Sequence, residues 1–118
     1  MGKQLFLKKN REFLQVYQQG KSKADRYLVL YVLRRENEDG VRFGLTVGRK
    51  LGKAVRRNRV KRRLREICRH LRPSLLPGYW LVIVARPAAA EADYHTLAAS
   101  LRKLLQKNGL LAEEGSRK

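Results

Sequence analysis

Residues 49–65 read RKLGKAVRRNRVKRRLR, and this stretch decides the fold. At about 100° per residue, positions 53–71 form a helix whose apolar side chains gather in a stripe about 100° wide, which is enough to pack on a sheet. The stripe consists of Val60, Leu64, Ile67, Cys68 and Leu71. Pro73 and Pro77 close the helical region. This segment, the basic helix, therefore docks by one face and presents cations on the rest of its surface.

Three apolar stretches predict the strands of that sheet. Residues 27–33 and 79–85 are apolar on both faces, which is typical of strands covered on both sides, so we expect 27–33 to lie centrally. Residues 41–47 form another strand, with Phe43 on one face and Gly44 and Thr46 on the other. The small side chains of that second face leave room for another group to approach closely.

Two more helices complete the predicted fold. Residues 10–20 start at a capping residue, Asn10, and stop at Gly20, while residues 92–108 carry one apolar stripe and stop at Gly109. We therefore predict an α+β protein, a two-layer α/β sandwich with the order α-β-β-(β)-α-β-α, in which the strand in parentheses is optional. Residues 1–118 form a single domain with an N-terminal arm at 1–8 and a disordered tail at 110–118.

Charge and cysteine content narrow the class of partner. The 118 residues include 28 lysines and arginines against 10 acidic residues, a formal charge of +18, and such a field is usually neutralised by a polyanion. Nucleic acid is the first candidate and an anionic membrane surface the second. Cys68 is the only cysteine, which excludes an internal disulfide and a cysteine-based zinc site. With no membrane-spanning stretch and no signal-peptide pattern, we expect a cytoplasmic protein.

The basic helix is the candidate nucleic-acid site. Cations three or four residues apart repel one another, and Glu66 is the only acid among them, so this arrangement costs stability until phosphates arrive. Arginine outnumbers lysine, which favours bidentate contacts with phosphate and stacking on bases. Asn58 is a poor interior helix former, so it indicates a specific hydrogen bond to RNA or to a neighbouring loop. The candidate residues are Lys53, Arg56, Arg57, Asn58, Arg59, Lys61, Arg62 and Arg65.

Residues 54–62, AVRRNRVKR, resemble the arginine-asparagine-arginine signature of the ribonuclease P protein component family. Residues 44–52 are similar to the strand and loop that precede this signature, and the resemblance extends over roughly residues 6–110. It implies a left-handed crossover between the strand before the basic helix and the strand after it. Sequence physics alone would favour the right-handed form. The arm, with Leu5, Phe6 and Leu7, is more apolar than the basic arm common in the family.

The same resemblance implies a function. A catalytic RNA would carry out the chemistry and use magnesium, while the protein would supply no catalytic residue, bind no cofactor through its own residues and be inactive alone. Its partners would be that RNA and the single-stranded 5′ leader of precursor tRNA, with one protein monomer for each RNA and no membrane contact. The protein would thus be a subunit of the endoribonuclease that matures tRNA 5′ ends.

Aromatic residues suggest where a leader would bind. Phe13 and Tyr17 lie one helical turn apart, and aromatic rings beside cations form a stacking platform for unpaired bases. The resemblance implies a cleft between the first helix and the sheet, lined by Phe13, Tyr17 and Tyr31, with Arg49 and Lys50 near the following loop. Phe43 is expected in the core, and Tyr27 either joins Tyr31 or packs internally.

Other site chemistry finds no support in the sequence. Residues 48–54, GRKLGKA, have three residues between the glycines and lack the hydroxyl of a phosphate-binding P-loop. His70 and His95 are isolated, and no carboxylates are paired as a two-metal nuclease requires. Two alternatives stay open: another structured-RNA-binding protein of ribosomal type without a role in cleavage, and peripheral membrane binding through the basic helix.

Overall fold

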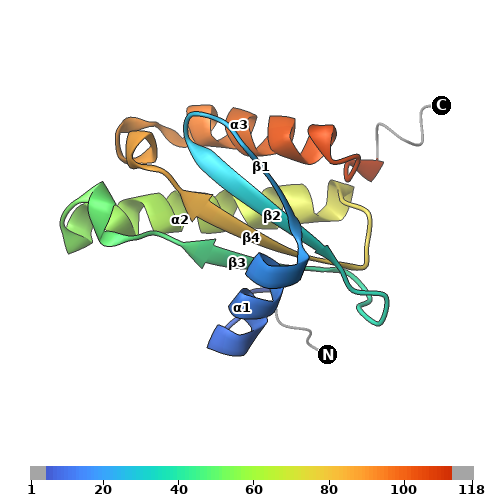
Figure 1. Ribbon diagram of the computed structural model, residues 1–118. Helices are drawn as coiled ribbons and strands as arrows, with labels where there is room; N and C mark the ends of the chain where they lie inside the picture. Colours follow the sequence, from blue (N-terminus) through green and yellow to red (C-terminus); the bar gives the residue numbers. More distant parts are fainter. Residues whose placement is uncertain (1–4, 113–118) are drawn as a thin grey trace.

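The computed structural model describes residues 5–112 and places four strands and three α-helices around one sheet (Figure 1). Three short 3₁₀ turns connect these elements. The helices and strands are α1 (Asn10–Gln19), β1 (Lys21–Ala24), β2 (Leu28–Arg34), β3 (Val41–Thr46), α2 (Ala54–Leu71), β4 (Tyr79–Ala85) and α3 (Tyr94–Lys107). The 3₁₀ turns are η1 (Arg49–Leu51), η2 (Arg72–Ser74) and η3 (Pro87–Glu91). The sequence of element types matches the predicted order, but the additional strand is β1, which precedes the strands predicted at 27–33 and 41–47.

The sheet has the strand order β1-β2-β4-β3. β2 and β4, the two strands predicted to be apolar on both faces, occupy the middle and pair antiparallel. β3 pairs parallel with β4, and β1 pairs antiparallel with β2. The central position expected for residues 27–33 is therefore confirmed, and β3 is left at an edge of the sheet.

The connection from β3 through α2 to β4 is the left-handed crossover that the resemblance implied. In Figure 1 both strands run toward the left and α2 lies behind the sheet. With the strands turned to point upward, β4 lies to the right of β3, and a right-handed crossover behind the sheet would require the reverse order. This hand places α2 on the face of the sheet opposite α1.

Two apolar cores lie on the two faces of the sheet. The larger core joins α2 and α3 to the sheet and contains the whole predicted stripe of the basic helix, together with Leu28, Leu30, Leu81 and Ile83 from the central strands. Phe43 is fully buried there, as expected, and Tyr27 packs against the same core. The smaller core lies under α1 and contains Leu7, Val16, Trp80 and Val82. The short helix α1 therefore covers part of the face opposite the main α/β sandwich.

The two ends of the described chain are more ordered than the sequence indicated. Main-chain bonds join the Leu7 amide to the Phe43 carbonyl at 2.7 Å and the Phe43 amide to the Leu5 carbonyl at 2.8 Å, so the arm extends along the outer edge of β3. The prediction of a disordered tail from residue 110 is wrong for Leu110 and Leu111. Both are buried, and Leu111 bridges Leu75, because these leucines cover the end of the main core. Residues 1–4 of the predicted arm and 113–118 of the predicted tail lie outside the described residues.

Candidate RNA-binding cleft and basic helix

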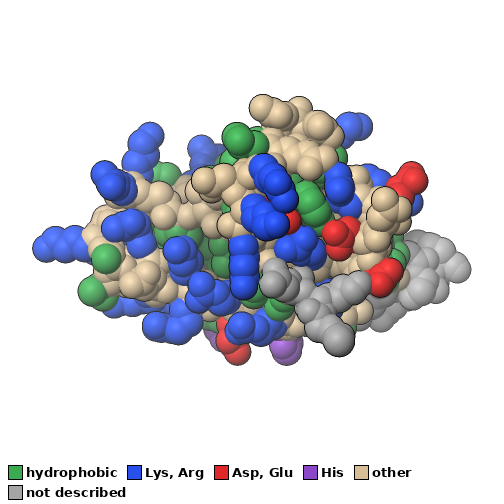
Figure 2. Space-filling view, turned by 90° about the horizontal axis from the view of Figure 1, so that it is seen from below, with side chains coloured by type: hydrophobic (Ala, Val, Ile, Leu, Met, Phe, Trp, Pro, Cys, Tyr) green, Lys and Arg blue, Asp and Glu red, His purple; other side chains and the backbone are tan. Residues whose placement is uncertain are grey.

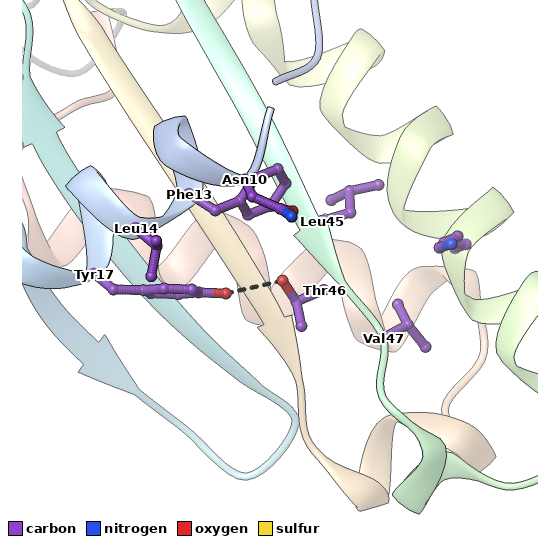
Figure 3. A pocket seen from close by; sticks show the side chains of 8 residues that line it. Asn10, Phe13, Leu14, Tyr17, Leu45, Thr46 and Val47 are labelled. Atoms are coloured by element: carbon purple, nitrogen blue, oxygen red, sulfur yellow. Dashed lines mark hydrogen bonds between the residues drawn. The ribbon is translucent and has the colours of Figure 1, made fainter. Parts of the chain in front are cut away.

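A cavity of about 570 Å³ opens across the free edge of β3, between α1 and α2. Figure 3 shows the side chains of α1 and β3 converging on it from two sides. The arm protects the edge of β3 only as far as Phe43, so the following residues, Leu45 to Val47, are open to this space. The cavity, which we call the cleft, is lined by Asn10, Phe13, Leu14, Tyr17, Leu45, Thr46, Val47 and Lys61.

Two aromatic side chains of α1 form one wall of the cleft, and each contacts a residue of β3. The Phe13 ring lies over Gly44, where an added Cβ would come within 2.7 Å of the ring. One turn further, the Tyr17 hydroxyl and the Thr46 Oγ1 are 2.9 Å apart in a hydrogen bond (Figure 3). The close approach predicted for the face of Gly44 and Thr46 is thus made by the aromatic side chains of α1. Both rings are fixed before any ligand binds.

Glu12 fastens the start of α1 to the same strand. Its Oε1 accepts the main-chain amides of Lys8 and Lys9 at 3.1 and 3.0 Å, and its Oε2 lies 3.4 Å from the Arg42 guanidinium. Burial alone would raise the pKa of the Glu12 carboxyl, but the amides of Lys9 and Lys8 and the charge of Arg42 together hold it below its ordinary value. Glu12 therefore stays ionised and holds α1 over β3.

The other predicted cleft residues take different positions. Tyr31 packs edge-on against Tyr17, with ring centroids 4.9 Å apart, so it supports that ring from behind and is not among the lining residues. Arg49 and Lys50 are exposed in η1, beyond the end of β3, and the structure does not bring them into the lining of the cleft.

A smaller cavity of about 290 Å³ lies next to the cleft. The two share Phe13, Leu45 and Lys61, and the smaller one adds Arg65 together with the arm residues Phe6, Leu7 and Lys8. Lys61 and Arg65, assigned from the sequence to the basic helix alone, therefore also face the aromatic residues of α1. The two candidate surfaces meet along one flank of α2.

Sequence reasoning missed several residues of the cleft. Leu14 is 53% exposed, which is unusual for a leucine beside a helical core stripe, and that exposure is visible only once α1 is docked. Asn10 was assigned to capping, yet Lys9 occupies the cap position and Asn10 lines the cavity. Leu45 and Val47 were assigned to a strand face, and their place at an open edge follows from the strand order.

Most candidates of the basic helix are exposed to solvent. Lys53, Arg56, Asn58, Arg59, Arg62 and Arg65 are exposed, and Arg57 and Lys61 are half-buried. Figure 2 shows lysine and arginine side chains far outnumbering acidic ones on the face seen from below. Among residues 5–112, Arg56 is the only one of these candidates with an ion pair, to Glu91 at 3.7 Å. The charge of α2 is thus largely uncompensated within the described chain.

The Arg57 side chain makes a hydrogen bond within the described residues, whereas the Asn58 side chain makes none. The Arg57 Nε donates to the Gly52 carbonyl at 3.1 Å, and Gly52 adopts a left-handed conformation with φ of 112°, which favours glycine. Arg57 therefore closes the loop that leads into α2. The Asn58 side chain is exposed and makes no hydrogen bond within the described residues, so the neighbouring-loop alternative finds no support there.

Sequence comparison adds the family. The profile of the family described as Ribonuclease P matches residues 1–109. This chain belongs to the ribonuclease P protein family. The ribonuclease P protein component of Symbiobacterium thermophilum is 44% identical over 115 residues, which cover 98% of this chain and 100% of that protein. That of Caldanaerobacter subterraneus subsp. tengcongensis is 47% identical over 108 residues and 92% of each chain.

Solved ribonuclease P proteins share the fold. The Staphylococcus aureus protein superposes with a TM-score of 0.85 at 30% identity, covering 92% of this chain and 99% of that one. The Thermotoga maritima protein gives 0.78 at 34% identity, with 86% and 94% covered. The protein is accordingly a subunit of the endoribonuclease that processes tRNA 5′ ends, and it associates with the ribonuclease P RNA. These matches favour ribonuclease P over a ribosomal type of RNA binding.

Membrane-spanning helices and metal-binding groups were the other features to look for in the described residues. Within residues 5–112, no helix combines the length and apolarity needed to span a bilayer. The same residues contain no group of three histidine, cysteine or acidic side chains placed to hold a metal ion. Cys68 is buried in the main core, and burial raises the pKa of its thiol.

Proposed function

We propose that this ribonuclease P subunit holds the single-stranded 5′ leader of precursor tRNA in the cleft and binds the catalytic RNA through the outward face of α2. One observation carries this proposal: Lys61 of α2 lines the cleft together with Phe13 of α1, and both residues also line the neighbouring cavity together with Arg65. Stacking rings and phosphate-binding cations thus face one another across the open edge of β3. That combination suits a single strand, whose bases and backbone are both accessible.

The rings of the cleft are held in place before RNA arrives. Phe13 rests on Gly44, and Tyr17 is tied to Thr46 and backed by Tyr31. When a base stacks on a ring that is already held in place, the protein side chain loses less conformational entropy than a mobile side chain would. Stacking of one base on an aromatic side chain contributes about 1–3 kcal/mol and tolerates different sequences, as a variable leader requires.

The outward face of α2, formed by Asn58, Arg59 and Arg62, suits a structured RNA. These side chains are exposed and, within residues 5–112, form no ion pair, so phosphates meet no competing carboxylate there. Each phosphate neutralised releases condensed counterions, which makes the affinity depend strongly on salt. Arginine also forms bidentate contacts with phosphate oxygens.

The cleavage chemistry belongs to the catalytic RNA in this proposal. Three described carboxylates have structural partners: Glu12 binds Arg42, Asp25 accepts from Ser100 at 2.5 Å, and Asp93 caps α3 by accepting from Thr96. The magnesium ions that the reaction uses would be held by RNA. One protein monomer would act with each RNA.

Reconstitution with a bacterial ribonuclease P RNA tests this proposal. We expect the protein to support cleavage of precursor tRNA at low magnesium and to be inactive alone. Phe13→Ala should weaken binding of precursor tRNA by about 1–3 kcal/mol, which is roughly 5- to 140-fold, and leave binding of mature tRNA unchanged.

Tyr27→Ala serves as the matched control, since Tyr27 is a partly buried ring that packs against the main core away from the cleft. It should leave the preference for precursor over mature tRNA intact. If Phe13→Ala weakens the binding of precursor tRNA and of mature tRNA equally, the leader does not bind in the cleft.

A further inference from the structure

A second hollow runs along the other flank of α2, facing η3 instead of α1. It has a volume of about 280 Å³, and we call it the η3 groove. On a helix, positions 56, 59 and 63 fall on one side of the apolar stripe, and positions 61 and 65 fall on the opposite side. The groove and the cleft are therefore separated by α2 itself. The groove is lined by Arg56, Arg59 and Arg63 from α2 and by Glu91, Ala92 and Asp93 from the opposite wall.

The three arginines of the groove differ in how they are held. The Arg63 guanidinium donates to the Ala92 carbonyl at 2.8 Å, which orients it along the groove while leaving other N–H groups available. Arg56 lies 3.7 Å from a Glu91 carboxylate oxygen. Arg59 stands at the border with the outward face of α2, exposed and with no ion pair among the described residues. The groove is thus a partly organised cluster of three positive charges.

The Arg56–Glu91 pair is weak and exposed. The side chains are 50% and 81% accessible, and exposed pairs of this kind contribute little to stability because solvent screens them. A carboxylate and a phosphate offer a guanidinium the same pair of oxygens, so an RNA phosphate can take the position of Glu91. Asp93 cannot move aside in the same way, because its carboxylate accepts the Thr96 amide at 2.9 Å as the cap of α3. It therefore confines an incoming anion to the α2 side of the groove.

We propose that the η3 groove is a second RNA-backbone site, in which a phosphate diester of the structured RNA displaces Glu91 and binds among Arg56, Arg59 and Arg63. The inference rests on the proposed function and extends it, because α2 then contacts RNA on both flanks, the leader on one and the catalytic RNA on the other. Glu91 acts as a built-in competitor that occupies Arg56 until RNA supplies a better anion.

Neutralising the competitor tests the site. Glu91→Gln should tighten binding of the ribonuclease P RNA, without precursor tRNA present, by roughly two- to fivefold at low salt, and the gain should shrink as salt rises. Glu36→Gln is the matched control: it makes the same change in net charge at an exposed position in the loop between β2 and β3, outside the groove. It should leave the affinity within error of the parent protein.

A double-mutant cycle locates the effect. In an Arg56→Ala background, Glu91→Gln should give no gain, because the arginine that it releases is absent. The proposal is overturned if Glu91→Gln behaves like Glu36→Gln, or if the gain persists without Arg56. Either result would contradict RNA binding in the η3 groove only. Leader binding in the cleft is tested separately by Phe13→Ala, which should still remove the preference for precursor tRNA.

Discussion

In the cleft each ring is held by a neighbour, whereas on the outward face of α2 the cations form no ion pair with a described carboxylate. Phe13 rests on Gly44 and Tyr17 is tied to Thr46, but Asn58, Arg59 and Arg62 extend into solvent without an internal ion pair. A rigid cleft can select a single strand by shape and stacking. An exposed cationic face gains affinity from phosphates of any sequence. The difference indicates that selectivity for the leader and affinity for the catalytic RNA reside in separate parts of the protein.

The largest expected effect comes from breaking the fit that holds the cleft rigid. In Gly44→Val, the added side chain would meet the Phe13 ring at 2.7 Å and Val82 at 3.2 Å, so Phe13 must leave its position. We expect a loss of about 1–3 kcal/mol in the free energy of unfolding, as for other overpacked cores, and a loss of preference for precursor tRNA. Chemical denaturation and paired binding measurements check this.

Gly48→Val is the control for that substitution. A Cβ at Gly48 meets nothing within 4 Å, and the residue has φ of −84°, which any residue adopts. It should preserve both stability and leader preference. If Gly44→Val preserves them too, the contact between Phe13 and Gly44 does not shape the cleft.

A smaller effect should follow from loosening α1 electrostatically. The pKa of Glu12 is lower in the folded protein than its ordinary value of 4.5, so the stabilisation that its charge provides is present above that value. It is lost as the pH falls through the folded pKa. Glu12→Gln, which carries no charge at any pH, should be less stable than the parent by on the order of 0.5–1 kcal/mol at pH 7, and the difference should shrink as the pH is lowered from 4.5 toward 3.

Thermal denaturation of both proteins across this pH range measures the difference. A constant difference between the two proteins from pH 7 to pH 3 would mean that the Glu12 charge does not hold α1. The expected effect on leader binding at pH 7 is smaller than that of Gly44→Val, because Phe13 keeps its place over Gly44.

The strong patterns of the sequence predicted the scaffold correctly. The apolar stripe of the basic helix is buried as expected, because a 3.6-residue period can be satisfied only by docking one face. β1 was not predicted at its position, since all four of its residues are exposed and carry no alternation to detect. The burial of Leu110 and Leu111 was missed because it depends on where the main core ends, not on local pattern.

The site was predictable in its parts but not in its arrangement. Phe13, Tyr17 and Lys61 were all singled out, yet nothing local to α2 reveals that Lys61 lies beside α1. The left-handed crossover places α2 on the face of the sheet opposite α1, and the two helices meet only across the edge of β3, where the cleft opens. Arg49 and Lys50 illustrate the converse, since their nearness in sequence to β3 does not bring them into the lining of the cleft.

Two binding measurements, each made as a function of salt, test the division between selectivity and affinity most directly. The first compares precursor tRNA with mature tRNA binding to the reconstituted complex. The second follows the catalytic RNA binding to the protein. Two variants are compared, Phe13→Ala and the double variant Arg59→Ala/Arg62→Ala. We predict that Phe13→Ala abolishes the preference for precursor tRNA and keeps the parent salt dependence for the catalytic RNA. The double variant should keep the preference and flatten the slope of log affinity against log salt by about two. If each variant changes both quantities to the same extent, leader selectivity and RNA affinity are not separate properties of the cleft and of α2.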